Sequence, residues 1–321
     1  MNSTRRDMVG VILAGGRGTR MAPFTNRYPK PILPICNIPL MEYHLQNMVD
    51  AGLNEVFVVV GHLGYEIALA IGRGRRIGIK IHYIEQSETL GIAHALGQLQ
   101  SYVKSPFVLF LGDIFFKTSG LPELVENFRE KEEGSILVVK EDEPKAIQKN
   151  FAVILDPETN RVRRVIEKPR YTHNRLKGCG LYLFDLPIFD AIRRTPRTAM
   201  RDEYEITDAI QILIDDGEPV EVANVVEEDI NLTTPNDLHR CNMAELDKRG
   251  GLSLIDETAS VHPQAVINHC VIGAGASIGE GVSLENCVVF ANSNIVKMDG
   301  VIRNYIITPE TAVDCSHLLT Q

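Results

Sequence analysis

The chain has 321 residues, of which 44% are apolar and 23% are charged, and its formal net charge is −9. This composition is that of an ordinary globular protein with one large domain, or with a large and a smaller one. The negative charge argues against general binding to nucleic acid or to an anionic membrane surface. Anionic substrates would therefore require arginine and lysine side chains gathered locally at the site.

No apolar stretch approaches the roughly 18 residues that a membrane span needs, and Val9 to Ala14 is too short for the core of a signal peptide. The six cysteines are scattered and form no CxxC pair, so neither a disulfide framework nor a zinc site is expected. Reduced cysteines fit best with a cytoplasmic protein.

Up to about residue 245, short β-branched runs alternate with longer amphipathic segments. The predicted strands are Val11 to Ala14, Glu55 to Val60, Ile79 to Ile84, Phe107 to Leu111 and Ser135 to Val139. The predicted helices are Leu40 to Ala51, Tyr65 to Gly72, Ile92 to Gln100, Pro122 to Glu132, and Ile206 to Asp215 with Thr207 as its N-cap. The alternation predicts an α/β fold, with a mostly parallel sheet covered by helices on both faces. Binding sites then form at the carboxyl ends of the strands.

The pattern changes in the tail, where apolar residues recur every six positions: Val266, Ile272, Ile278, Leu284, Phe290, Val296 and Ile302. This period is typical of a parallel β-helix, in which three sides make a coil of about eighteen residues. Residues 254–308 then allow roughly three coils. We therefore expect a catalytic domain over 1–250 and a β-helix over 251–321. An irregular strand-rich cap is the alternative for the tail.

The most informative motif is the run VILAGGRGTR, from Val11 to Arg20. Glycines let backbone N–H groups approach phosphate oxygens closely, and nearby arginine and lysine side chains neutralise the charge. The run is not a dinucleotide fingerprint, because the third glycine would fall at Met21, and it lacks the Lys-Ser/Thr of a P-loop. A nicotinamide-dependent oxidoreductase is therefore disfavoured. A purely structural glycine turn is the alternative.

The run resembles the signature of the nucleotide-sugar pyrophosphorylases, the sugar-1-phosphate nucleotidyltransferases, and PKPILPI (Pro29 to Ile35) resembles their second motif at the usual distance. The likeness extends over essentially the whole chain. It implies a Rossmann-like nucleotidyltransferase domain, here followed by a short left-handed β-helix. It also implies that Arg17 and Lys30 contact the triphosphate, with Arg20 either supporting them or pinning the loop through a carboxylate. The residues implied for nucleotide binding in this loop are Leu13, Ala14, Gly15, Gly16, Gly18 and Thr19.

Gln86 and Gly91 lie in a segment that resembles the base-reading segment of the same family. A glutamine amide can accept from N3–H of uracil or thymine and donate to O4, which favours UTP or dTTP over purine nucleotides. Ile92 stands where uridylyltransferases often have Thr, so the choice between the two pyrimidines stays open. A surface role is the alternative for Gln86, and His94 is interpreted as a helix-packing residue.

Gly112 and Asp113 end a predicted apolar strand, where a carboxylate either caps a turn or binds a cation. The resemblance implies that Gly112 lies at the nucleotide and that Asp113 binds Mg²⁺. For the second metal ligand it indicates Asn231, and Asp229 is the rival because residues two apart in a strand share a face. An amide oxygen can bind Mg²⁺, which takes its remaining ligands from phosphates and water.

The motif VIEKP resembles the family segment whose glutamate binds sugar hydroxyls and whose lysine binds the sugar phosphate, which here are Glu167 and Lys168. Ala152 and Gly178 are the other residues implied for the sugar-phosphate pocket. Phe151-Ala152 stands where many relatives have Tyr-Gly, which leaves the sugar open. Gly178 stands where N-acetylglucosamine enzymes often have Asn, which argues against an N-acetylhexosamine.

The resemblance implies an enzyme that forms a nucleoside-diphosphate sugar and pyrophosphate from dTTP or UTP and a sugar 1-phosphate, with glucose 1-phosphate favoured. The reaction would be a Mg²⁺-dependent in-line displacement, with Arg17, Lys30, Asp113 and Lys168 as the catalytic residues. Alternatives are another hexose-1-phosphate uridylyl- or guanylyltransferase and a non-catalytic regulatory paralogue that binds nucleotides. We expect a homo-oligomer, because open β-helix coils leave unpaired edges.

Overall fold

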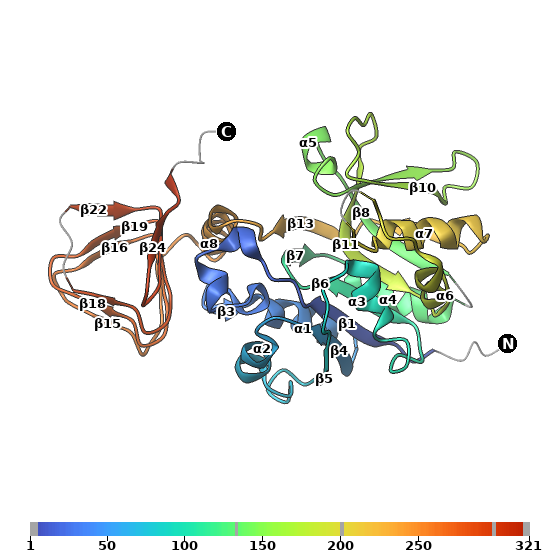
Figure 1. Ribbon diagram of the computed structural model, residues 1–321. Helices are drawn as coiled ribbons and strands as arrows, with labels where there is room; N and C mark the ends of the chain where they lie inside the picture. The colour runs from blue at the N-terminus through green and yellow to red at the C-terminus, as the bar shows by residue number, and fades with distance from the viewer. Residues whose placement is uncertain (1–5, 132–133, 200–201, 297–299, 317–321) are drawn as a thin grey trace. The chain divides into compact units, whose positions relative to one another are not determined.

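The computed structural model describes residues 6–131, 134–199, 202–296 and 300–316 (Figure 1). The chain divides into two compact units, which we name the sheet unit, of residues 1–17 and 41–229, and the β-helix unit, of residues 18–40 and 230–321. Among the helices that the structure describes, none combines the length and apolar character needed to cross a membrane. The two units are described in turn.

The sheet unit is built on one mixed sheet. Four of its strands are parallel and adjacent in the order β6 (Phe107–Leu111), β1 (Val9–Ala14), β4 (Glu55–Val60) and β5 (Lys80–Glu85). The central strand β1 is almost wholly apolar, as expected of a strand covered on both faces. The register pairs Leu13 with Leu111 and Ala14 with Val60, so that neighbouring strands end at the same edge of the sheet.

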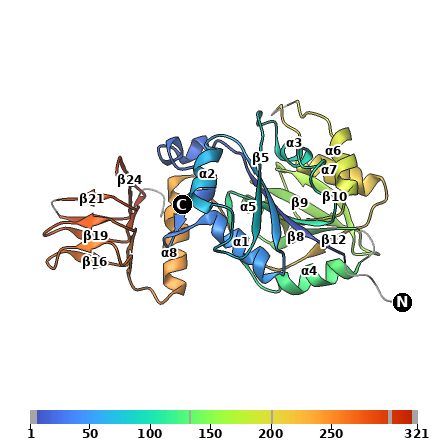
Figure 2. The same cartoon turned by 90° about the horizontal axis from the view of Figure 1, so that it is seen from below.

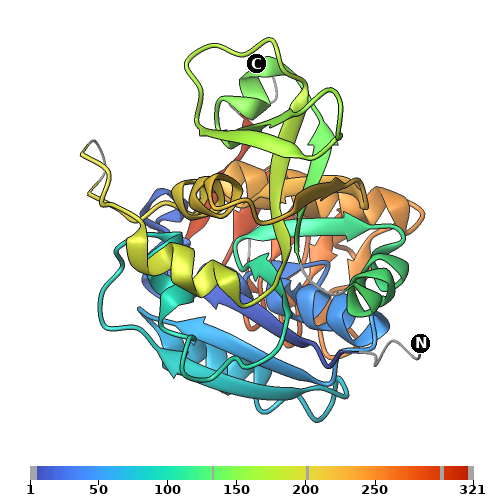
Figure 3. The same cartoon turned by 90° about the vertical axis from the view of Figure 1, so that its right-hand side faces the viewer.

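The remaining strands form the other half of this sheet. The long strand β11 (Leu176–Phe184) runs antiparallel to β6 and pairs with β8 (Ser135–Glu141) and β9 (Phe151–Leu155). In turn, β10 (Val162–Glu167) pairs with β9, and β12 (Val220–Ala223) pairs with β8. Figure 3 shows β9 and β10, in yellow-green, at the upper edge of the unit. A separate pair consists of β7 (Ile114–Thr118) and β13 (Val226–Asn231).

Helices cover both faces of the sheet, and the predicted fold class is confirmed. The helices are α1 (Leu40–Asp50), α2 (Gly64–Ile71), α3 (Ile92–Gly97), α4 (Leu121–Glu130), α5 (Pro144–Ile147), α6 (Pro187–Arg194) and α7 (Ile206–Asp215). On one face, α3, α6 and α7 pack against Val11, Val59 and Leu109. On the other face, Met48 of α1 packs on Gly10, where a Cβ atom would lie 2.4 Å from Sδ of Met48.

The predicted strands and helices of this unit are all present, and their ends differ by at most three residues from the predicted ones. The prediction of Thr207 as the N-cap of α7 is wrong. Glu205 occupies that position, and Thr207 lies inside the first turn. Thr207 is 2% exposed, so its hydroxyl faces the interior and not the open end of the helix.

The β-helix unit begins with the loop segment 18–40 and continues with α8 (Pro235–Lys248) and the coils. Thr234 and Asp237 form a capping box at the start of α8. The loop segment contains the 3₁₀ turns Thr19–Met21, Phe24–Asn26 and Lys30–Ile32 and the short pair β2 (Pro34–Ile35) and β3 (Ile38–Pro39).

Three short parallel sheets form the sides of the coils, and their strands follow one another cyclically along the chain (Figures 1 and 2). The first side holds β14 (Leu254–Ile255), β17 (Val271–Ile272), β20 (Val288–Val289) and β23 (Tyr305–Ile307). The second holds β15 (Ser260–Val261), β18 (Ser277–Ile278) and β21 (Asn294–Ile295). The third holds β16 (Val266–Asn268), β19 (Ser283–Glu285) and β22 (Val301–Arg303). The antiparallel strand β24 (Ala312–Asp314) pairs with β23.

The strict period of six is wrong in detail. Register pairs such as Val271 with Val288 show a spacing of 17 residues in the earlier coils, whereas Val288 pairs with Ile306, 18 residues on, in the last. The shift in phase leaves Val266 59% and Val296 70% exposed, although the period places them inside. Phe290 also lies outside the apolar cluster that fills the coils, which includes Ile272, Ile278, Leu284, Val289, Ile295, Ile302 and Ile307.

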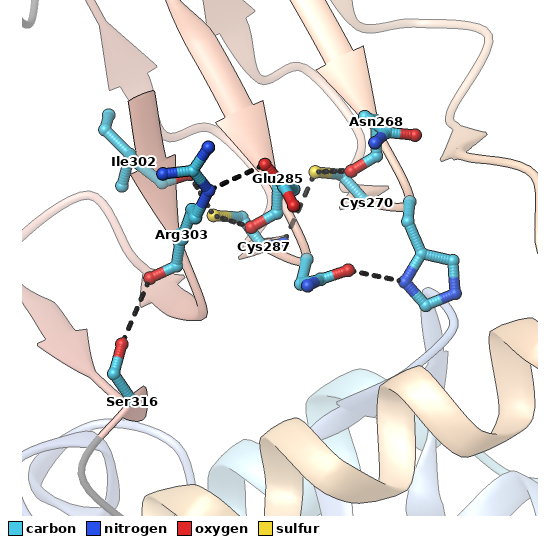
Figure 4. Close-up of polar contacts among 9 residues, drawn as sticks. Asn268, Cys270, Glu285, Cys287, Ile302, Arg303 and Ser316 are labelled. Carbon is cyan, nitrogen blue, oxygen red and sulfur yellow. Dashed lines mark hydrogen bonds and ion pairs between the residues drawn. The ribbon is translucent and has the colours of Figure 1, made fainter. Parts of the chain in front are cut away.

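Cysteines contribute to the interior of the coils. The backbone N–H of Cys287 donates to Sγ of Cys270 on the preceding coil, at 3.3 Å (Figure 4). On the outside of the next coils, Arg303 donates to Glu285 at 2.7 Å. All six cysteines of the chain are buried and free.

Candidate active site

The ends of β1 and β6 carry the first part of the predicted nucleotide site. The backbone N–H of Gly112 donates to the carbonyl of Leu13 at 2.9 Å, which continues the pairing of these strands past their last residues. A Cβ atom at position 112 would lie 2.6 Å from the same carbonyl oxygen, so only glycine fits there. Asp113 follows directly and is half-buried. The predicted residues Leu13, Ala14, Gly15, Gly112 and Asp113 therefore lie at one edge of the sheet.

Gln86 reaches the same edge from the end of β5. Its backbone N–H donates to the carbonyl of Val60 at 2.8 Å, and its side chain lies against Gly15. A Cβ atom at position 15 would be 1.8 Å from Nε2 of Gln86, and one at Gly61 would be 2.7 Å from the Gly15 carbonyl oxygen. The glycine turn and the glutamine amide are thus in van der Waals contact.

The Gln86 side chain is 7% exposed, which disagrees with the alternative of a surface role. Its Oε1 atom is buried and accepts no hydrogen bond within the part of the chain that the structure describes. An unsatisfied buried amide oxygen costs about 1–3 kcal/mol. An unsatisfied Oε1 atom is therefore expected if Gln86 accepts a hydrogen bond from a ligand.

Gly91 is held by a residue that sequence reasoning missed, Tyr204. The backbone N–H of Tyr204 donates to Leu90 at 2.7 Å, and its carbonyl accepts from Ala93 at 3.0 Å. Gly91 has φ of +106°, and a Cβ atom there would lie 2.5 Å from the Tyr204 carbonyl oxygen. The chain around Tyr204 therefore fixes the segment that carries Gly91. The sequence gives no signal that links the segment of Gly91 to Tyr204, more than a hundred residues away. The glycine before α3 suggests only that another part of the chain lies close to it.

The glycine-rich loop continues across the boundary between the units, which falls between Arg17 and Gly18. In the sheet unit, Gly16 and Arg17 are exposed. In the β-helix unit, Gly18 has φ of +63°, and its carbonyl accepts from the hydroxyl of Thr25 at 3.0 Å. Thr19 and Arg20 in the turn that follows are exposed.

The side chain of Lys30 lies along Gly18. A Cβ atom at position 18 would be 3.0 Å from Cε and 3.1 Å from Cγ of Lys30. Lys30 is only 8% exposed. The two residues predicted to bind the triphosphate from this segment are therefore packed on each other.

His44 of α1 lies behind Asp113 and was not predicted. Its Nε2 atom is 2.7 Å from the carbonyl oxygen of Ile114, and its ring lies 5.3 Å from the Phe110 ring and 5.8 Å from the Phe116 ring. Burial lowers the pKa of His44 from 6.5 to about 4, and the Ile114 carbonyl and the charge of Asp113 oppose this only in part. The imidazole is therefore neutral near pH 7 and holds the chain beside Asp113.

Among the described residues, no group of three or more His, Cys, Asp or Glu side chains is placed to hold a metal ion. Asp229, the rival for the second metal position, is 1% exposed and paired with Lys177, whose Nζ atom lies 3.0 Å from Oδ1 and 2.7 Å from Oδ2. Nζ of Lys140 is 3.7 Å from Asp229 Oδ1, and Lys177 also lies 2.7 Å from Asp142. Asn231 ends β13 within the β-helix unit.

These four residues form a buried ion network that the sequence did not reveal. Burial alone would lower the pKa of Lys177, but the charges of Asp229 and Asp142 raise it above the usual value, so the lysine stays charged. The carboxylate of Asp229 is thereby neutralised within the protein. This favours Asn231 over Asp229 as a ligand for a cation.

Glu167 and Lys168 lie at the end of β10. Lys168 has φ of +39°, its N–H donates to Asn150 at 2.8 Å, and its Nζ atom is 3.2 Å from Oε1 of Glu167. The hydroxyl of Thr207 in α7 lies 3.4 Å from Oε2 of Glu167. The backbone of Lys168 and the carboxylate of Glu167 are therefore both held by hydrogen bonds.

Gly178 and Ala152 are buried within the sheet. A Cβ atom at position 178 would overlap the Phe151 ring, at 1.8 Å from Cζ. The Phe151 ring in turn stacks on Tyr182, with ring centroids 6.2 Å apart and ring planes 9° apart. The Phe151 ring therefore occupies the space in which a side chain at position 178 would begin.

Comparison with known proteins agrees with this geometry. Residues 9–247 match the family model described as nucleotidyl transferase, and residues 250–320 match that of the GMPPB C-terminal domain. The low-salt glycan biosynthesis nucleotidyltransferase Agl11 of Haloferax volcanii is 34% identical over 90% of this chain and 89% of its own. Glucose-1-phosphate thymidylyltransferase of Streptomyces antibioticus is 32% identical over 85% and 80%. A solved structure from Bacillus anthracis, described as a glucose-1-phosphate thymidylyltransferase, has a TM-score of 0.67 and 25% identity, over 75% of this chain and 96% of that one.

Proposed function

The chain belongs to the nucleotidyl transferase family, and we propose that it forms a nucleoside-diphosphate sugar from dTTP or UTP and glucose 1-phosphate. The observation that carries the pyrimidine preference is the buried amide of Gln86, which is packed on Gly15 and has an unsatisfied Oε1 atom. This oxygen would accept from N3–H of uracil or thymine, while Nε2 would donate to O4. A purine offers a different pattern of donors and acceptors to the same amide.

The remaining roles follow from charge and position. Arg17, Lys30 and the supporting Arg20 would neutralise the triphosphate, and the backbone of residues 13–19 would approach its oxygens. Lys168 would hold the phosphate of the sugar 1-phosphate, and Glu167 would accept from sugar hydroxyls. Nζ of Lys168 and Oε1 of Glu167 lie 3.2 Å apart at the end of β10.

The chemistry requires no general base, because the attacking phosphate oxygen is already anionic near pH 7. That oxygen forms a bond to the α-phosphorus of the nucleotide, the bond from the α-phosphorus to the bridging oxygen breaks, and pyrophosphate leaves. Positioning of the two anions and neutralisation of their charge carry catalysis. The protein therefore has to gather mutually repelling groups, and the cationic loop is suited to this.

A divalent cation fits the residues present. Mg²⁺ is usually held by one or two carboxylates together with substrate phosphates and water, and Asp113 is a half-buried carboxylate at the edge that also carries Gly15 and Gln86. We propose Asp113 and Asn231 as its ligands, since Asp229 is neutralised by Lys177. When bound, the ion would screen the charge of the nucleotide phosphates.

The wider expectations stay proposals. We propose that residues 1–250 carry catalysis and that residues 251–321 form a left-handed β-helix tail. The buried free cysteines support a cytoplasmic location. Exposed apolar side chains on the coils, among them Val266 and Val301, support association into a homo-oligomer. Light scattering of the purified chain tests the last point.

A pyrophosphate-release assay tests the function, with four nucleoside triphosphates against a panel of sugar 1-phosphates. We expect turnover with a pyrimidine nucleotide and glucose 1-phosphate. Replacement Asp113→Ala or Lys168→Ala is expected to lower kcat at least about a hundredfold with the circular dichroism spectrum unchanged. Lys80→Ala, which removes an exposed ion pair with Glu55, is the matched control. Full activity in either of the first two variants would reject the assigned role, and no turnover with any pair would indicate a non-catalytic nucleotide-binding protein.

A further inference from the structure

One side of the β-helix has a buried outer face. On this side, Ile272, Val289 and Ile307 point into the coils, so the residues before them, Val271, Val288 and Ile306, face outward. All three of these outward-facing residues are at most 1% exposed. The outer face of this side is therefore covered within the β-helix unit.

Part of this cover is the loop segment 18–40, which precedes the sheet helices in the sequence. Nδ2 of Asn37 donates to the carbonyl of Ile272 at 2.8 Å. An exposed ion pair joins Arg27 to Glu310. The segment is thus tied to the first coil side at more than one point and belongs to the same compact unit.

Phe290, directly after β20, makes an aromatic contact with this segment. Its ring stacks on Phe24 at 5.7 Å between centroids, and it meets the edge of Tyr28 at 5.5 Å. Phe290 is only 3% exposed, yet it lies outside the apolar cluster that fills the coils. Its side chain therefore serves this contact and not the coil interior.

The contact continues to the residues that the proposed function assigns to the triphosphate. Phe24 is followed by Thr25, whose hydroxyl donates to the Gly18 carbonyl at 3.0 Å. The Lys30 side chain packs on Gly18 on its other flank. A short and continuous chain of contacts therefore runs from Phe290 through Phe24 and Thr25 to Gly18 and Lys30.

We propose that the β-helix acts in nucleotide binding, and that Phe290 is a positioning residue for the segment that carries Gly18 and Lys30. The inference rests on the proposed role of that segment at the triphosphate. Without the Phe290 ring, Phe24 and Tyr28 lose their packing partner, and the loop gains freedom that nucleotide binding must then remove. The affinity for the nucleoside triphosphate should therefore fall. The affinity for the sugar phosphate should not, because its proposed ligands Glu167 and Lys168 lie in the sheet unit.

The test compares Phe290→Ala and Phe290→Leu with Leu284→Ala in the full-length chain. Leu284 is 1% exposed inside the coils, so its truncation destabilises the β-helix without removing the aromatic contact. We expect Phe290→Ala to raise the KM for the nucleoside triphosphate about tenfold, which is what the loss of two aromatic contacts can supply. The KM for the sugar 1-phosphate should change by less than about twofold, because the substitution does not affect the residues proposed to bind the sugar phosphate. Phe290→Leu should recover part of the loss.

The outcomes separate this inference from the proposed function. If the wild type shows no turnover and no nucleotide binding by calorimetry, the proposed function fails. If the wild type is active and Phe290→Ala keeps its nucleotide KM, only the positioning role fails. An equal rise in KM in Leu284→Ala would also overturn it, because general loosening of the coils would then be the cause. A double-mutant cycle of Phe24→Ala with Phe290→Ala should give a non-additive KM, and additive effects would contradict the contact chain.

Discussion

The buried imidazole of His44 makes the stability of the protein depend on pH. Its pKa is about 4 in the folded protein and 6.5 as an ordinary histidine, because the ring lies between Phe110 and Phe116 and donates its Nε2–H to Ile114. Between these two values the unfolded chain binds a proton at this residue and the folded chain does not. The stability contribution is therefore fully present above pH 6.5 and is lost as the pH falls toward 4.

The magnitude follows from the displaced pKa. Each pH unit below 6.5 costs about 1.4 kcal/mol until the folded pKa is reached, so that the full loss is about 3 kcal/mol. Between pH 7.5 and pH 5, His44 alone should lower the free energy of unfolding by about 2 kcal/mol. His239 of α8 is also buried and has a lowered pKa. Its contribution cancels when the wild type is compared with a variant at His44, because both proteins contain His239.

The assay is urea unfolding of the nucleotide-free wild type and of His44→Gln, followed by circular dichroism because the chain has no tryptophan. Glutamine can still donate to Ile114 but does not titrate. The difference in unfolding free energy between the two proteins should shrink by about 2 kcal/mol from pH 7.5 to pH 5. His173→Gln is the control, because it removes a histidine from an exposed loop. Parallel curves for wild type and His44→Gln would refute the reasoning.

Two further predictions concern packing at the site. Gly15→Ala places a methyl group on the Gln86 amide, at 1.8 Å from Nε2. It should lower kcat/KM for the nucleotide at least about tenfold with the melting temperature nearly unchanged. Gly97→Ala in α3 is the control, and equal kinetics of the two variants would contradict the close contact. Lys177→Met leaves the buried carboxylate of Asp229 without its main partner and should destabilise the chain by about 3–5 kcal/mol in urea unfolding. A second change, Asp229→Leu, should restore most of that stability, and failure to do so would show that the lysine acts through something other than charge.

The parallel half of the sheet could be predicted because its strands are short and, except for β5, mostly apolar, and because helices separate them along the chain. Strands β4 and β6 were predicted to the residue. Of the strands in the other half, β8 was predicted, but β10 and β12 were not, since Arg163 and Arg164 in β10 and Glu221 in β12 interrupt their apolar residues. Their pairing partners, and not their own composition, make them strands.

The site was predictable wherever one residue type is forced by the backbone. Gly91 and Gly112 each leave no space for a Cβ atom beside neighbouring backbone, so the sequence had to keep a glycine there and the motif is visible. Tyr204 acts mainly through its backbone N–H and carbonyl groups, which any residue could supply. A residue that works through its backbone leaves no trace in the pattern of side chains, so only the structure could reveal it.

The ion network around Lys177 shows a different limit. Lys140, Asp142, Lys177 and Asp229 come from β8, the residue after it, β11 and β13, and each alone is an unremarkable charged residue. Only the pairing of β8 with β11 places Lys177 opposite Lys140 and brings two like charges together. Lys140 is partly exposed and Lys177 is buried, and the carboxylates of Asp142 and Asp229 offset the repulsion between the two lysines. The network therefore ties β8, β11 and β13 together next to Gly178, and removing one of its charges alone leaves a buried partner unpaired.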